Sequence, residues 1–142
     1  MKRRTTGRLT FGGRRFGAAA FALSCAVAGA ALRAAELPVA LREARAAVAD
    51  ELFDMAREKA ARILGHPASS VEAKDSAAVV YMEALCRAGH YEEALDAEDS
   101  YIASDGGERR AVALWGGIAR YELGRYAAAA ERLESAAASG DS

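Results

Sequence analysis

The stretch Gly89-His90-Tyr91-Glu92-Glu93-Ala94 recurs 35 residues later as Gly124-Arg125-Tyr126-Ala127-Ala128-Ala129, so both copies follow the pattern Gly-x-Tyr-x-x-Ala. A partial copy, Phe53-Asp54-Met55-Ala56, places an aromatic residue and an alanine 38 residues before those of the first full copy. Self-similarity at such a period is typical of proteins built from one repeated supersecondary unit. The recurrence therefore predicts three consecutive copies of that unit.

The spacing within the pattern predicts an antiparallel helix hairpin. The glycine tolerates the left-handed turn that ends one helix. The aromatic residue two positions later can fill the wedge between the two helices, and the alanine one turn further along lets them approach closely. These repeat-forming positions are Phe53, Ala56, Gly89, Tyr91, Ala94, Gly124, Tyr126 and Ala129.

Composition after residue 35 favours an all-α fold. Strong helix formers dominate this part, and β-branched residues are sparse, which argues against a β-sandwich or a Rossmann unit. Ser69 and Glu72 have the spacing of a capping box at the start of a helix. We expect helices at residues 38–49, 52–64, 71–88, 91–104, 109–122 and 125–138, forming three hairpins.

The first unit leaves two interpretations open. Glu51 occupies the position of the turn glycine, and no helix breaker interrupts the run from Val39 to Leu64. Apolar residues in this run continue at helical spacing, so a single long helix is the alternative to a hairpin.

A period in the mid-thirties with this element resembles the tetratricopeptide repeat, a helix-turn-helix unit of 34 residues. The resemblance covers residues 38–142 and implies a short right-handed solenoid. Its units would be a degenerate first repeat at about 38–67, a second at 71–105 and a third at 108–142. The sequence departs from the family at Trp115, which falls two places after the family's tryptophan, and the proline expected after each second helix is present only as Pro67.

The resemblance also implies a binding groove. In tetratricopeptide arrays the first helix of each pair lines a concave surface that holds a peptide or helix. The chain contains no Asn, so the Asn and Lys clamp that some members place on a peptide carboxylate is excluded. Trp115 and Tyr121 are the best anchor candidates, with packing inside the repeat as their alternative role. The predicted partner-binding residues are Val79, Val80, Glu83, Leu114, Trp115, Ile118 and Tyr121.

Residues 1–35 form a separate compositional segment. They carry seven basic groups and no acid, and an apolar run from Phe16 to Leu32 is followed by small residues. This order is typical of a bacterial export signal, with an uncleaved membrane anchor as the alternative. Arg14-Arg15 gives a weak twin-arginine pattern, and Cys25 ends a stretch similar to a lipobox. We expect an exported protein, in the periplasm or attached to the membrane of the bacterial envelope.

No pattern in the chain predicts catalysis or a cofactor. The sequence lacks the nucleophile-elbow, phosphate-loop and His-Glu-x-x-His motifs. Cys86 and His90 offer two ligands where zinc needs three or four, so Cys86 is predicted to be a core residue. The acidic group Glu92, Glu93, Asp96, Glu98, Asp99 and Asp105 is interpreted as a solvated helix face.

Net charge narrows the class of partner. Residues 36–142 carry 12 basic and 20 acidic groups, so this part has a net charge of −8 and would repel nucleic acid. We therefore expect a noncatalytic scaffold that binds a protein or peptide, with membrane contact limited to the N-terminal segment. One alternative is a regulatory segment of a larger envelope enzyme or assembly factor. Another is a helical bundle that self-associates through its alanine-rich C-terminal hairpin.

Overall fold

The computed structural model describes residues 34–104 and 110–138. Over these residues the chain is helical without a strand, and a short 3-10 helix (Ala34–Glu36) leads into the first α-helix. The α-helices are α1 (Leu37–Ala49), α2 (Phe53–Leu64), α3 (Val71–Arg87), α4 (Tyr91–Ala103), α5 (Arg110–Glu122) and α6 (Tyr126–Ala138). The predicted all-α class is confirmed, and each predicted helix is found with its ends within one residue. The expected signal or anchor segment lies outside the described residues, apart from its last two.

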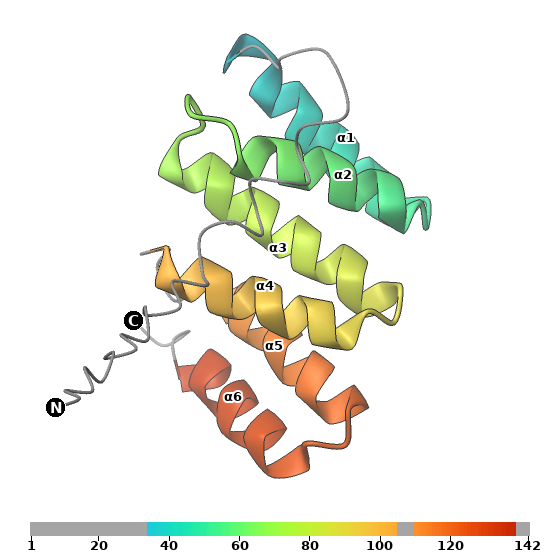
Figure 1. Cartoon of the computed structure of the whole chain (residues 1–142), viewed down its shortest axis with the longest axis vertical. Helices are drawn as coiled ribbons and strands as arrows, with labels where there is room; N and C mark the ends of the chain where they lie inside the picture. Colours follow the sequence, from blue (N-terminus) through green and yellow to red (C-terminus); the bar gives the residue numbers. More distant parts are fainter. Residues whose placement is uncertain (1–33, 105–109, 139–142) are drawn as a thin grey trace, which may run out of the picture.

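The helices follow one another along the long axis of the molecule, from α1 at one end to α6 at the other (Figure 1). Each helix packs against the next, and α3 also packs against both α1 and α5. No backbone contact joins α2 to α4, or α4 to α6, within the described residues. The first helices of the three hairpins thus form a continuous series, and each second helix lies against it.

Residues 39–64 form a hairpin, and the single long helix is wrong. The chain turns between α1 and α2 at Asp50, Glu51 and Leu52. All three hairpins turn through the same Schellman motif, in which two backbone N–H groups reach back to carbonyls of the preceding last turn. The bond that spans five residues in each motif runs from Leu52 N to Ala47 O at 2.8 Å, from His90 N to Leu85 O at 2.9 Å and from Arg125 N to Arg120 O at 2.8 Å.

The left-handed residue of each turn explains the recurring glycine. Gly89 has φ +82° and Gly124 has φ +74°. Glu51 holds the same position in the first turn with φ 59°, a conformation that costs a residue with a Cβ about 1–2 kcal/mol. The first hairpin forms without its glycine because the packing of α1 and α2 on α3 offsets this strain.

The predicted capping box before α3 is shifted by one residue. The helix begins at Val71 as expected, but its N-cap is Ser70, whose Oγ accepts a hydrogen bond from Ala73 N at 3.2 Å. Ser69 instead donates its hydroxyl to the carbonyl of Ile63 at 2.7 Å. Ser69 therefore ties the connecting loop back to the end of α2.

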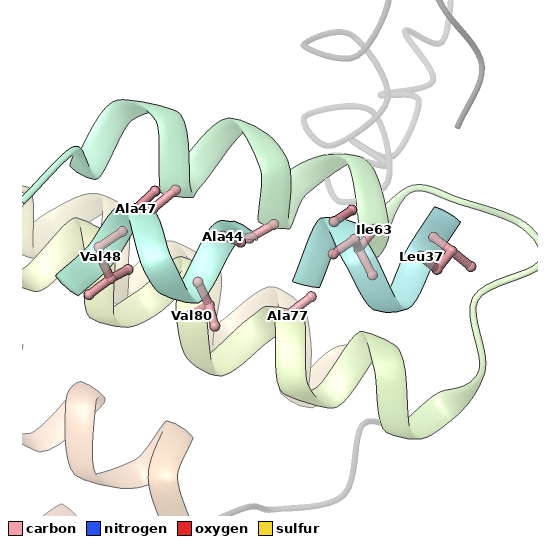
Figure 2. Packing of buried hydrophobic residues seen from close by; sticks show 11 residues of the cluster. Leu37, Ala44, Ala47, Val48, Ile63, Ala77 and Val80 are labelled. Carbon is pink, nitrogen blue, oxygen red and sulfur yellow. The ribbon is translucent and has the colours of Figure 1, made fainter. Parts of the chain in front are cut away.

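Two clusters of buried side chains form the core. In the first, residues of α1, α2 and α3 converge, including Ala44 from α1, Ile63 from α2 and Val80 from α3 (Figure 2). The second cluster joins α3, α4 and α5. Leu64 and Tyr81 pack against both clusters, so the two cores are continuous across α3. Alanine is the commonest of the buried residues, and its small side chain allows the helices to approach closely.

Candidate partner-binding surface

Helix α5 has two different faces. Its buried face consists of Val112 and four smaller residues, Ala113, Gly116, Gly117 and Ala119. Leu114, Ile118 and Tyr121 follow one another at intervals of four and three residues, so they share another face. Leu114 is 44% exposed and Tyr121 58% exposed, and Ile118 is half-buried. The helix therefore presents an apolar stripe to solvent, which is where polar residues are expected on a helix of this kind.

The two predicted aromatic anchors differ in their surroundings. Trp115 is half-buried and packs against the second core, and its carbonyl accepts a hydrogen bond from the Cys86 thiol at 3.6 Å. Tyr121 has its ring in an edge-to-face arrangement with Tyr126, with centroids 5.3 Å apart. Trp115 thus contributes to packing, whereas Tyr121 offers its ring to solvent.

The predicted groove residues of α3 lie deeper than those of α5. Val80 is 3% exposed and belongs to the first core, so a surface partner does not reach it. Val79 is half-buried and packs against the second core. Glu83 is half-buried as well and forms an ion pair with Arg87 at 3.6 Å. Of the predicted partner-binding residues, those of α5 are therefore the more exposed.

The alanines of the repeat are buried, and two of its three aromatic residues pack against the cores. The alanines Ala56, Ala94 and Ala129 are at most 2% exposed. Phe53 packs against the first core and lies under the guanidinium of Arg87, which is 5.3 Å from the ring centroid. Tyr91, at the equivalent position of the second hairpin, packs against the second core.

Tyr126 is the exception, with 63% of its surface exposed. Among the described helices, the backbone of α6 approaches that of α5 alone. Its remaining surface carries exposed alanines, including Ala127, Ala130 and Ala137. The last hairpin therefore has an apolar surface that no described helix covers.

A buried ionic cluster joins the last three helices. Glu98 of α4 is fully buried, and its carboxylate accepts hydrogen bonds from Arg120 of α5 at 2.5 Å and from Arg132 of α6 at 2.6 Å. Arg120 also donates to the carbonyl of Gly116 at 2.9 Å. A buried carboxylate is stable only when its oxygens are paired in this way. The cluster fixes the relative positions of α4, α5 and α6.

Glu98 corrects the interpretation of the acidic group as one solvated face. Glu92, Glu93, Asp96 and Asp99 are exposed as predicted, whereas Glu98 points inward. Asp105 lies outside the described residues. The sequence held one signal for this, the glycine at position 116 within a helix, because a Cβ there would collide with the Glu98 carboxylate. Gly117 has a similar role, since a Cβ would lie 2.6 Å from Leu133 of α6.

A second buried polar pair links α3 to α4. Asp75 is 3% exposed, and its carboxylate accepts a hydrogen bond from the hydroxyl of Tyr101, which is 8% exposed. Neither residue stands out in the sequence, because an aspartate in the first turns of a helix is ordinarily a surface residue.

Cys86 is a core residue, as predicted. It is 5% exposed, and burial, with a smaller contribution from the charge of Glu98, raises the pKa of its thiol to about 12. His90 is exposed, and its Nδ1 lies 3.1 Å from the Glu93 carboxylate. Over residues 34–104 and 110–138, no three His, Cys, Asp or Glu side chains are grouped as metal ligands would be.

A membrane-crossing helix is not found in the part of the chain that the structure describes.

Comparison of the chain with protein-family models, with curated proteins and with solved structures finds no match.

Proposed function

We propose that this chain is a noncatalytic interaction scaffold of the bacterial cell envelope. Its helix hairpins would stack as a short tetratricopeptide-like right-handed solenoid and bind a peptide or helix of a partner protein. The apolar stripe of Leu114, Ile118 and Tyr121 on α5 is the observation that carries this proposal. An exposed apolar stripe on a folded helix is typical of an interaction surface.

The pattern of helix contacts supports the solenoid. The first helices α1, α3 and α5 pack in series, as the groove-lining helices of a tetratricopeptide array do. The three hairpins share one turn geometry at equivalent positions, which is expected of true repeats. Stacked units of this kind bury a continuous core and leave one surface for a partner.

Charge and apolar character together define the partner. The part of the chain from residue 36 has a net charge of −8, and the α5 stripe itself is uncharged. A basic, amphipathic segment would place its apolar face on the stripe, and its positive charge would be attracted by the net negative charge of this part of the chain. Exported location rests on the composition of residues 1–35. An intact N-terminus at Met1 in protein extracted from membranes would contradict both processing by a signal peptidase and lipidation at Cys25.

Site-specific photo-crosslinking tests the α5 surface. We would place p-benzoylphenylalanine at Leu114 in the full chain, expressed in its native envelope. The matched control carries the same group at Ile102 of α4, which is 46% exposed against 44% for Leu114. We expect a discrete protein adduct from position 114 and none from position 102.

A second substitution checks that the adduct depends on the stripe. Tyr121→Ala removes an exposed ring and leaves the core intact, so folding is retained and the yield of adduct from position 114 falls. Equal adducts from positions 102 and 114, or an adduct insensitive to Tyr121→Ala, would contradict the proposal.

A further inference from the structure

A pocket lies between the second helices of the first two hairpins. Helices α2 and α4 both pack on α3, but their backbones do not approach each other within the described residues. Toward the start of both helices, Arg57 of α2 and Glu93 of α4 bridge the gap with an ion pair of 3.4 Å. Toward their ends the gap widens into a pocket of about 470 Å³. This volume lies in the range of small-molecule sites in proteins.

The wall of the pocket is mainly apolar. Alanines at positions 61, 78 and 97 leave space that larger side chains would fill, and Leu64, Tyr81 and Met82 complete the apolar lining. Leu64 and Tyr81 also pack against both cores, so this wall is part of the packed fold. A ligand for this wall must have an apolar body.

The polar groups of the pocket favour an anion. Among the described residues that line the pocket, Lys74 is the one cation and none is a carboxylate. The hydroxyl protons of the lining serines are already used within the protein, since Ser100 donates to Asp96 O and Ser104 donates to Tyr101 O, each at 2.8 Å. The Tyr101 hydroxyl likewise donates to Asp75. The ammonium of Lys74 is therefore the charged donor that the described lining residues offer to a ligand.

The helix ends around the pocket do not reverse this preference. Helices α2 and α4 end here, and exposed terminal carbonyls attract cations. Two of these carbonyls, however, already accept serine hydroxyls, Ile63 O from Ser69 at 2.7 Å and Tyr101 O from Ser104 at 2.8 Å. The N-terminus of α3, whose partial charge is positive, lies one turn before Lys74.

We propose that this pocket binds an amphipathic carboxylate, with the alkyl chain against the alanines and Leu64 and the carboxylate on Lys74. The site is separate from the α5 stripe and does not depend on the proposed partner binding.

Calorimetric titration of the full chain with decanoate, below its micelle concentration, tests the site. We expect saturable binding of decanoate, and no binding of acetate, which lacks the chain. Decanol and decyltrimethylammonium keep the chain and change the headgroup, so both should bind at least tenfold more weakly. Lys74→Met keeps the aliphatic stem but removes the charge, and should weaken decanoate binding roughly tenfold, the effect of one charge-assisted hydrogen bond at a half-exposed site.

Matched variants separate the pocket from general apolar binding. Lys59→Met makes the same change on α2, at a residue that does not line the pocket, and should leave decanoate binding unchanged. Ala61→Leu fills a half-buried wall position and should weaken it at least tenfold, whereas Ala46→Leu on the exposed face of α1 should not. Unchanged binding in Lys74→Met, equal losses in Lys59→Met, or binding of the cationic amphiphile as strong as that of decanoate would overturn the proposal.

Discussion

At the scale of single residues, the left-handed positions show how one backbone conformation is reached from two kinds of side chain. Gly89 and Gly124 adopt it without strain, and Glu51 adopts it against the preference of a residue with a Cβ. A Cβ at either glycine would meet no neighbouring atom within 4 Å. The preference for glycine here is therefore a property of the backbone alone.

Glu51→Gly is expected to stabilise the protein. The substitution removes about 1–2 kcal/mol of left-handed strain from the folded state. Glycine also raises the conformational entropy of the unfolded chain, which lowers stability by about 0.4–1 kcal/mol, so we expect a net gain of about 0.5–1 kcal/mol. Urea denaturation measures it. The neighbouring Asp50 has φ −86°, so Asp50→Gly serves as the control and should destabilise. A loss of stability in Glu51→Gly would show that the turn is held by the glutamate side chain.

Cys86 should resist thiol reagents in the folded protein. Its pKa is raised from 9.0 to about 12, so the thiol stays protonated at pH 8 and is shielded by the core. In a Cys25→Ser variant, Ellman's reagent should react at the rate of unfolding, and at once after denaturation. Because the folded pKa is the higher one, stability is expected to fall as the pH rises above about 9. Rapid reaction at pH 8 in the native state would contradict this burial.

At the scale of elements, α5 combines two roles on one helix. Its small residues let α4 and α6 approach, with Glu98 above Gly116 and Leu133 above Gly117. Of its larger residues, Trp115 packs against the second core, whereas Leu114 and Tyr121 face solvent. The exposed apolar side chains of Leu114 and Tyr121 are the reason why the proposed partner contact is placed on this helix.

Alanine substitutions on α5 should separate these roles. Trp115→Ala removes a half-buried ring and is expected to cost about 2 kcal/mol, below the range for fully buried aromatic residues. Leu114→Ala should change the free energy of unfolding by no more than about 0.5 kcal/mol. Thermal and urea denaturation compare the two. If Trp115→Ala leaves stability unchanged, Trp115 belongs to the contact surface instead.

At the scale of the whole molecule, the buried ionic cluster holds the C-terminal hairpin in place. Helices α1, α2 and α3 share an apolar core. By contrast, Glu98 of α4 is linked to α5 through Arg120 and to α6 through Arg132. Removing one member of such a cluster leaves uncompensated charge in a buried site, which costs about 3–5 kcal/mol.

Glu98→Gln should therefore loosen one end of the molecule. Hydrogen exchange is expected to lose protection in α5 and α6 while α1, α2 and α3 retain it, with a fall of about 3 kcal/mol in the free energy of unfolding. Glu93→Gln alters an exposed pair with Arg57 and is the control, expected to change stability by less than about 1 kcal/mol. Uniform loss of protection along the chain would show that the two cores unfold as one unit.

Local signals in the sequence determined the helices and their turns. The positions of Gly89 and Gly124, the alanines of the repeat and the abundance of helix formers act within a few residues, so their effect is visible without a fold. The repeat pattern also predicted the close approach of its alanines and favoured the hairpin at Glu51 that the structure confirms.

Only the tertiary structure decided which side chains face one another. Glu98 and Asp96 look alike in the sequence, yet one is buried between two arginines and the other is exposed, because the direction of each depends on where α5 and α6 lie. Val79 and Val80 are likewise adjacent but pack against different cores. The pocket beside Lys74 arises where the three consecutive helices α2, α3 and α4 meet. Burial and pairing depend on contacts between such segments, and helical periodicity describes one segment at a time.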